Sequence, residues 1–104
     1  MTRYVLLPAS PAEVSAWRAG DVVFVSGAVL TARDLAHRRI LAAAQRGEAL
    51  PFDPTGLPIF HCGPLARRDA GGWTITGLGP TTSARMDPST PEILARYRTP
   101  FLIG

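Results

Sequence analysis

The stretch VVFVSGAVLTARDLAHRRILAAAQRG, residues 22–47, places a strand directly before a helix and decides the fold class. Residues 22–26 are almost all β-branched or aromatic, as in a central strand of a sheet. Gly27 indicates a turn, and a second short apolar run covers residues 28–30. This order of elements is typical of an α/β or mixed domain.

The helix predicted after residue 30 is amphipathic. Its apolar residues recur at helical spacing and form the stripe that we expect to be buried, namely Ala36, Ile40, Ala43 and Ala44. We expect Thr31 to cap the first turn, with Asp34 three residues on completing a variant of the capping box. Gly47 is expected to end the helix.

Elements of the same two kinds are predicted on both sides of this stretch. The expected strands are residues 3–7, 57–62, 73–77 and 101–103. A short helix should begin at the capping box Ser10-Pro11-Ala12-Glu13, and a last helix should begin at Thr90 and stop before Pro100. Residues 48–56 and 63–72 are expected to be loops, the second with a Gly71-Gly72 turn.

The length and composition predict a single domain over residues 1–104. It has 104 residues, of which 46% are hydrophobic and 18% charged, enough for one modest core. No apolar stretch is long enough to cross a bilayer, and the N-terminus lacks the pattern of a secretory signal. We therefore expect a cytoplasmic protein without membrane association.

The positive charge has an unusual composition, because all 11 basic residues are arginine and lysine is absent. The net charge of +3 raises the question of nucleic-acid binding, but no base-stacking aromatics are interleaved with the arginines. We expect most of them to lie on solvated faces or in surface ion pairs: Arg38, Arg39, Arg46, Arg67, Arg68, Arg96 and Arg98.

The only cysteine, Cys62, limits the redox and metal chemistry of this chain. One thiol forms no internal disulfide and cannot by itself hold zinc or an iron-sulfur cluster. Cys62 follows a predicted buried strand, so we interpret it as a packed, inert thiol rather than a reactive one.

The segment Thr31–His37 contains an arginine where local physics disfavours it. Arg33 faces the positive end of the predicted helix, an unfavourable placement by about 0.3–1 kcal/mol. A bound anion offsets this cost, because a helix N-terminus and a guanidinium both donate to carboxylates. His37 lies on the same helical face and either touches the ligand or is simply a half-exposed helix residue. We expect Asp34 to pair with Arg38 rather than to act in catalysis.

A second segment, Gly79–Asp87, also combines hydroxyl side chains and backbone N–H groups with an arginine. Gly79-Pro80 fixes a turn, after which Thr81, Thr82 and Ser83 present hydroxyls and backbone N–H groups in succession. Arg85 adds positive charge. Alone this pattern would favour an ordinary helix cap, but together with Thr31–His37 it indicates a site for a small carboxylate.

The two segments together resemble the beta subunit, or C-terminal domain, of class I iron-sulfur fumarases and L-tartrate dehydratases, and the likeness extends from Gly20 to Gly104. The resemblance implies a swivelling β/β/α domain. It also implies a hydro-lyase that reversibly hydrates fumarate to malate, or dehydrates tartrate. The implied cofactor is a [4Fe-4S] cluster held by three cysteines of an alpha subunit, so that the active protein would be a hetero-oligomer.

The resemblance also implies roles for individual residues. Thr81 would accept the proton beside a substrate carboxylate, and Arg33 and Arg85 would bind carboxylates, with Thr82 and His37 also in contact with substrate. Removing that proton places negative charge on the carboxylate, which fixed guanidinium groups stabilise. Threonine is a weak base, and the resemblance assigns its activation to an aspartate of the partner.

The sequence departs from the family pattern at its end. The pattern has a lysine beside the glycine that is Gly104 here, and this sequence contains no lysine. We therefore expect a domain whose C-terminal part is missing and which is inactive in isolation. An alternative is a non-catalytic interaction or regulatory module that keeps the fold and the anion pocket. Which hydroxy acid would be the substrate is left open.

Overall fold

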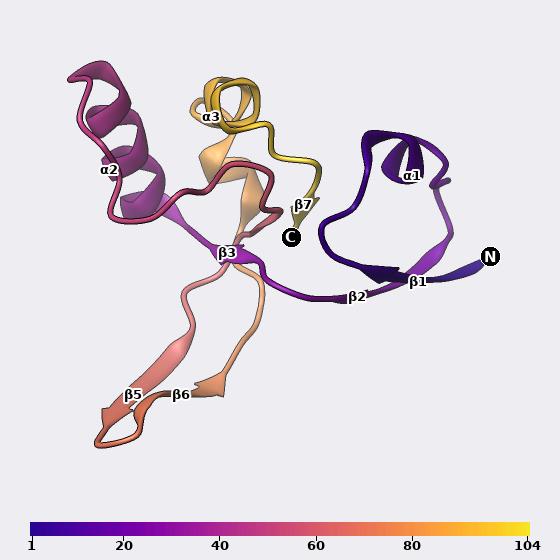
Figure 1. Cartoon of the computed structure of the whole chain (residues 1–104), viewed down its shortest axis with the longest axis horizontal. Coiled ribbons are helices and arrows are strands. Elements are labelled where there is room, and N and C mark those ends of the chain that lie inside the picture. The colour runs from indigo at the N-terminus through magenta and orange to yellow at the C-terminus, as the bar shows by residue number, and fades with distance from the viewer.

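The structure is a computed structural model that describes residues 1–104, and it is a mixed α/β fold with small sheets (Figure 1). The elements follow the order β1 (Thr2–Leu6), α1 (Pro11–Ser15), β2 (Val22–Ser26), β3 (Leu30–Thr31), α2 (Asp34–Gln45), β4 (Ile59–Phe60), β5 (Leu65–Asp69), β6 (Gly72–Gly77), the 3₁₀ helix η1 (Ser83–Met86), α3 (Thr90–Tyr97) and β7 (Leu102–Ile103).

A parallel sheet of three short strands, in the order β3-β4-β7, carries the core. Helices α2 and α3 pack against each other and lie together on one side of the molecule (Figure 1). Between them and the sheet lies a cluster of four buried residues: Ala32, Ile40, Ile59 and Ile93. The predicted apolar stripe of α2 is confirmed at its centre, since Ile40 and Ala43 are buried.

The predicted cap of α2 is wrong. Thr31 belongs to β3, where it pairs with Phe60, so its backbone is committed to the sheet. The residue before the helix is Arg33, in extended conformation and without a side-chain cap. The first turn of α2 therefore keeps unpaired backbone N–H groups beside two charged side chains.

The strand expected at residues 57–62 is shorter than predicted, because β4 covers only Ile59 and Phe60. Pro58 has no N–H to donate to a neighbouring strand. Beyond β4 the chain turns tightly, with the Cys62 N–H donating to the Phe60 carbonyl at 2.9 Å. This turn redirects residues 61–64 beneath the first turn of α2.

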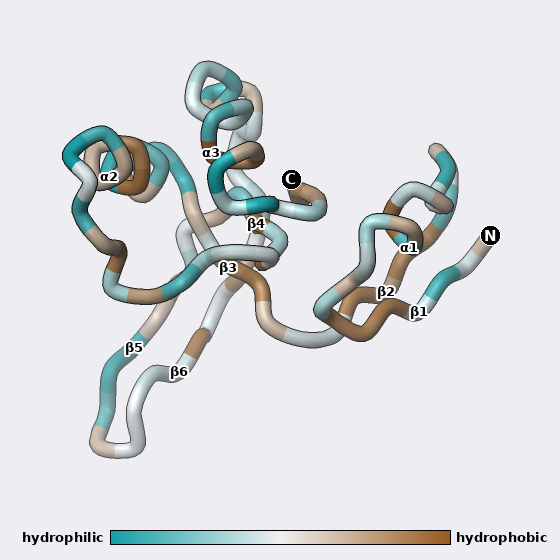
Figure 2. The backbone as a smooth tube through the Cα atoms, turned by 45° about the horizontal axis from the view of Figure 1, so that its top comes forward, coloured by the Kyte–Doolittle hydropathy of each residue, from teal (hydrophilic) through white to brown (hydrophobic).

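Strands β1 and β2 form a separate parallel pair, so β2 is not the central strand that its sequence predicts. The N-cap of α1 predicted at Ser10 is confirmed, since the Glu13 N–H donates to Ser10 Oγ at 3.1 Å, while the Glu13 side chain does not return the second bond of a capping box. The outward face of the pair is apolar and exposed, with the rings of Tyr4 and Phe24 stacked at 5.2 Å. Figure 2 shows this pair as one of the most hydrophobic parts of the backbone.

Strands β5 and β6 form an antiparallel hairpin that projects away from both helices (Figure 1). The prediction of a loop over residues 63–72 is wrong for β5, whose polar sequence Ala66-Arg67-Arg68-Asp69 has no apolar alternation. Pairing with β6 fixes it as a strand instead. No residue of β5 is buried, which explains why hydrophobic pattern gave no signal.

The accessible surface of the molecule is larger than that of a typical compact monomer of the same mass. Its accessible area is 7000 Å², whereas a well-packed monomer of 11.1 kDa exposes roughly 5,700 Å². The projecting hairpin and the uncovered face of β1 and β2 account for this shape. None of the helices combines the length and the apolar character that crossing a bilayer demands.

Candidate anion-binding site

The two segments singled out from the sequence meet in the structure, although about fifty residues separate them. Arg85, in η1, donates from Nε and Nη2 to the two carboxylate oxygens of Asp34, at 3.0 and 3.1 Å. Its Nη2 also donates to Thr81 Oγ1 at 2.9 Å. Arg33 completes the group, with its Nε 3.4 Å from Asp34 Oδ2. Two guanidinium groups, one carboxylate and one hydroxyl thus share a single site.

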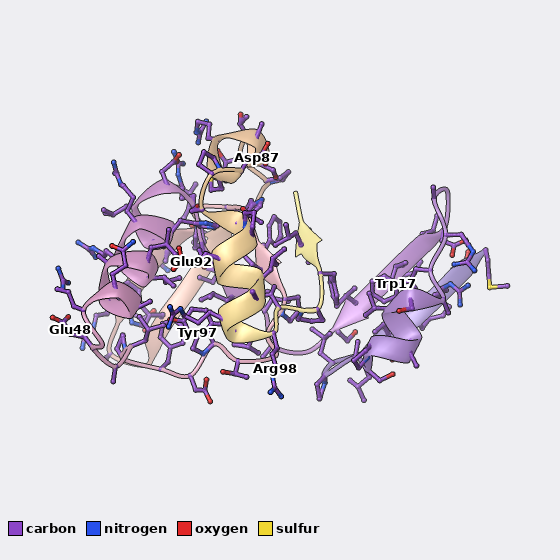
Figure 3. All side chains as sticks on the ribbon, turned by 90° about the horizontal axis from the view of Figure 1, so that it is seen from above. Trp17, Glu48, Asp87, Glu92, Tyr97 and Arg98 are labelled. Carbon is purple, nitrogen blue, oxygen red and sulfur yellow. The ribbon has the colours of Figure 1, made fainter.

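Short local elements hold these side chains in place. Thr81 is fastened by its backbone, because its N–H donates to the His61 carbonyl at 2.7 Å. Met86, at the end of η1, is 2% exposed and anchors that turn in the interior. Asp34 is the first residue of α2, where a carboxylate is favourable beside the helix N-terminus. Asp87 directly follows η1, at the start of the segment that leads into α3 (Figure 3).

The prediction that Asp34 pairs with Arg38 is wrong. Its carboxylate lies between Arg33 and Arg85, and Arg38 is an exposed residue of α2. The hydrogen bonds from Arg85 hold the pKa of Asp34 at about 2, below its ordinary value of 3.8, and Asp34 in turn raises the pKa of Arg85. Asp34 is therefore ionised at neutral pH and orients Arg85.

Both arginines keep donors that nothing in the chain uses. Arg33 uses only Nε, in its ion pair with Asp34, and 51% of its side chain is exposed. Arg85 donates from Nε and Nη2 to Asp34 and Thr81, whereas its Nη1 has no hydrogen-bond partner. Its side chain is 44% exposed. A guanidinium carries five N–H donors in a planar fork that matches a carboxylate. The site can accept a further anion from solution.

Two hollows flank this group of side chains. A cavity of about 750 Å³ borders Arg33 and Asp34 and is lined by apolar residues of α2 and of the loop at residues 50–52. A smaller hollow of about 260 Å³ lies on the Arg85 side. Asp34 lines both, so it stands at the boundary between them. Thr81 lies outside both cavities, and is half-buried.

His37 is neither half-exposed nor free. It is 2% exposed, and its Nδ1 lies 3.0 Å from Ser89 Oγ. His61, which the sequence gave no reason to select, is equally buried, with Nδ1 2.7 Å from Ser83 Oγ. Burial lowers the pKa of both imidazoles.

Three further residues complete the description of the site. Thr82 precedes η1, is exposed, and makes no side-chain cap. Cys62 is 1% exposed and burial raises the pKa of its thiol, which confirms a packed cysteine. Gly63 was missed: a Cβ there would lie 2.9 Å from Arg33 Cδ, so glycine leaves room for that side chain. The His-Cys-Gly-Pro turn after a strand was the only available signal.

The residues of this chain do not form a metal centre. Nowhere do three or more His, Cys, Asp or Glu side chains gather in a group that could hold an ion. Cys62 is the single thiol and is buried. An iron-sulfur cluster therefore does not fit the side chains of this chain.

Comparison with known proteins identifies the family of the chain. The sequence model of the family described as "Fumarase C-terminus" matches residues 2–104. The L(+)-tartrate dehydratase subunit beta of Escherichia coli K12 is 31% identical over 104 residues, all of this chain and 50% of that protein. A Methanocaldococcus jannaschii protein whose name assigns it to the same subunit is 35% identical over 92 residues, 88% of this chain and 47% of its own.

A third relative is named for a different reaction. A Geobacillus stearothermophilus protein whose name assigns it to class I fumarate hydratase is 31% identical over 98 residues, which are 93% of this chain and 18% of that protein. The chain spans about half the length of the tartrate dehydratase subunits it matches. The match of the family over nearly every residue, with these relatives, shows that the chain belongs to the fumarase C-terminus family.

Proposed function

We propose that this chain is the beta subunit, or part of the beta subunit, of a hydro-lyase that adds water to fumarate or removes it from tartrate. The observation that carries the proposal is the contact of the two segments, in which Arg85 bridges Asp34 and Thr81 beside Arg33. The names of the relatives, tartrate dehydratase beta subunit and class I fumarate hydratase, supply the reaction class. The finer fold assignment, a swivelling β/β/α domain, belongs to the same proposal.

In this proposal Arg33 and Arg85 bind the carboxylate next to the carbon that loses its proton. Loss of that proton shifts negative charge onto the carboxylate, so the unused donors of both arginines bind the transition state more strongly than the ground state. Asp34 holds Arg85 in one orientation, which lowers the cost of reorganisation during the reaction. The two guanidinium groups thus favour charge development at a fixed place.

Thr81 is proposed as the proton acceptor. Its oxygen already accepts a hydrogen bond from the Arg85 guanidinium at 2.9 Å, and a cation beside a hydroxyl stabilises the alkoxide. The hydroxyl proton remains available to a base. No carboxylate of this chain takes that place, because Asp34 is bound to the two arginines. We assign the activating base to an alpha subunit.

The alpha subunit is also the proposed carrier of a [4Fe-4S] cluster, because the side chains of this chain do not fit one. The exposed apolar face of β1 and β2 offers surface to a partner, since parallel strands are normally covered on both faces.

The test is turnover in a complex assembled with a cluster-bearing alpha subunit. We expect Thr81→Val to lower kcat by about 100-fold or more, as for loss of a general base. Arg85→Ala should lower kcat/KM by about 100- to 1,000-fold. Thr55→Val and Arg46→Ala are matched controls, since both residues are exposed and lie outside the site. The isolated chain should show no turnover.

Two outcomes would overturn the proposal. Full activity of the Thr81→Val complex would remove the proton-transfer role. A stable complex that binds its partner but turns over neither fumarate nor tartrate would favour a non-catalytic interaction module instead.

A further inference from the structure

Two buried histidines lie directly behind the anion-binding site. His37 and His61 are each 2% exposed, and the centroids of their rings are 5.4 Å apart with the planes tilted by 56°. In both rings Nδ1 contacts a serine hydroxyl, while Nε2 is buried and has no hydrogen-bond partner in the chain. Buried polar groups are normally paired, so this arrangement calls for a reason.

The tautomer of His37 follows from its serine partner. Ser89 Oγ donates its single proton to the Met86 carbonyl at 3.0 Å. The same oxygen can then only accept from the imidazole, which requires the proton of His37 to be on Nδ1. The Nε2 atom of His37 is therefore an unprotonated acceptor.

The tautomer of His61 follows from its neighbour. Ser83 Oγ makes no other hydrogen bond, so its proton is free to be donated to His61 Nδ1 across 2.7 Å. If His61 also carried its proton on Nδ1, two acceptor lone pairs would lie buried in adjacent rings without a donor. The opposite tautomer, with the proton on Nε2, lets Ser83 donate to Nδ1 and leaves only one acceptor lone pair buried without a donor, since neither Nε2 atom has a hydrogen-bond partner in the chain. Burial lowers the pKa of both rings and so favours their neutral forms.

The two serines lie at opposite ends of the segment that carries Arg85. Ser83 begins η1 and Ser89 immediately precedes α3. The histidines come from other elements, His61 from the turn after β4 and His37 from the second turn of α2. Each imidazole therefore joins one end of the segment to a different part of the core.

We propose that His37 and His61 are positioning residues, which hold residues 83–89 at both ends through neutral imidazoles of opposite tautomer and thereby place Arg85 against Asp34 and Thr81. Neither ring contacts the proposed substrate. The consequence for turnover rests on the proposed function, but the placement of Arg85 does not.

The first measurement needs no substitution and no partner. Nitrogen-15 NMR of the imidazoles in the full chain at neutral pH should show one ring protonated on Nδ1, assigned to His37, and one on Nε2, assigned to His61. The same tautomer in both rings, or a doubly protonated ring, would overturn the proposal.

The second measurement follows the Nε–H signal of Arg85 in the same spectra. In the wild-type chain this proton is held by Asp34 and should be distinct from those of free arginines. His61→Leu should move it toward the free position, whereas His61→Asn, whose amide can replace Nδ1, should restore it. Cys62→Ala is the matched control, because it removes buried volume at the next position and no hydrogen bond. An unmoved Arg85 signal in a folded His61→Leu chain would contradict the proposal.

Turnover in the assembled complex separates this proposal from the proposed function. We expect His61→Leu to lower kcat/KM by about 10- to 100-fold, because Arg85 is displaced, while His61→Asn and Cys62→Ala stay near wild type. Equal losses in His61→Leu and Cys62→Ala would reduce the role to simple packing and refute it. If the wild-type complex turns over nothing, the proposed function fails, and the two NMR measurements still decide the positioning role.

Discussion

The region around the anion-binding site and the β5–β6 hairpin follow opposite structural rules. The first, formed by residues 28–64 and 79–104, contains nearly every buried residue, including the two histidines and the isoleucine cluster. In the two strands of the hairpin every residue is exposed except the half-buried Gly77. An isolated two-stranded hairpin is marginally stable in water. Charged side chains are fixed by groups anchored in the interior in the first region, whereas in the second Asp69 is held only by its own turn and by the exposed Thr74.

The arginines illustrate the difference. Arg85 is fixed by three hydrogen bonds to side chains that are themselves anchored. Arg68, in the hairpin, only lies over the ring of Trp73 at 5.8 Å, and both residues face solvent. The same residue type is thus held by a hydrogen-bond network in one place and faces solvent in the other, which composition alone does not distinguish.

The largest expected effect is on stability, from truncating one isoleucine in each region. Ile93→Ala removes a side chain that is 1% exposed and should lower the free energy of unfolding by about 2–5 kcal/mol. Ile75→Ala, at a residue 53% exposed in β6, should change it by no more than about 0.5 kcal/mol. Urea unfolding measures both, and equal losses would break the comparison.

A smaller effect is expected from adding one methyl group beside a guanidinium. Gly63→Ala would place a Cβ 2.9 Å from Arg33 Cδ and displace that side chain. We expect kcat/KM of the assembled complex to fall by about 10- to 100-fold. Gly71→Ala in the hairpin turn meets only ordinary contact with Asp69 and should leave turnover unchanged. Steady-state kinetics of the two variants measures this difference. Wild-type kcat/KM in Gly63→Ala would contradict the assignment of Arg33 to carboxylate binding.

The pH dependence of stability should also originate in the first region. Burial lowers the pKa of His37 and His61 below 6.5, although Asp34 and Asp87 oppose it weakly, so the unfolded chain binds more protons. The free energy of unfolding should therefore fall as the pH drops from about 7 through the ordinary histidine pKa of about 6.5. Urea midpoints at about pH 7 and about pH 5.5 measure this. Replacing both histidines by asparagine should flatten the slope, and an unchanged slope would contradict the account.

At lower pH, protonation of Asp34 should weaken its pairing with the arginines and lower the stability further. Its pKa of about 2 lies below the usual 3.8, so its pairing contributes stability above that usual value, which is lost as the pH falls toward 2. Asp34→Asn should remove this part of the acid dependence and free the Arg85 Nε–H signal in NMR spectra. Retention of the wild-type Arg85 signal would show that Asp34 does not orient it.

The smallest effect concerns the two tryptophans. Trp73 is 68% exposed, whereas Trp17 is partly covered by Phe101, with ring centroids 5.0 Å apart. Figure 3 shows Trp17 within the unit of β1, α1 and β2. In single-tryptophan variants, Trp17→Phe and Trp73→Phe, acrylamide should quench Trp73 more strongly than Trp17. The reverse order would mean that the hairpin folds back onto the molecule in solution.

The sequence predicted those parts of the fold that local pattern controls. The N-cap at Ser10, the strand at residues 22–26 and the helix starting at Thr90 are confirmed, because each depends on neighbouring residues. The cap of α2 and the strand β5 were predicted wrongly. Both depend on pairing with another strand, the distant β4 for Thr31 and the adjacent β6 for β5, which overrides local preference.

For the site, the sequence identified the two segments but not how they are joined. Arg33, Thr81 and Arg85 are brought together as expected, and their roles stay predictions. The partner of Asp34 was assigned to Arg38, four residues away, because helical spacing was the only available guide. The actual partner is 51 residues away in sequence. His61 carried no motif, and only burial and its contact with Ser83 single it out.

The most direct test of the central claim is a crystal structure of this chain assembled with a cluster-bearing alpha subunit and a bound dicarboxylate. The account predicts that free donors of Arg33 and Arg85 bind one carboxylate, with Thr81 Oγ1 at about hydrogen-bond distance from the adjacent carbon's proton. A dicarboxylate bound elsewhere, with Arg33 and Arg85 both facing solvent, would contradict it.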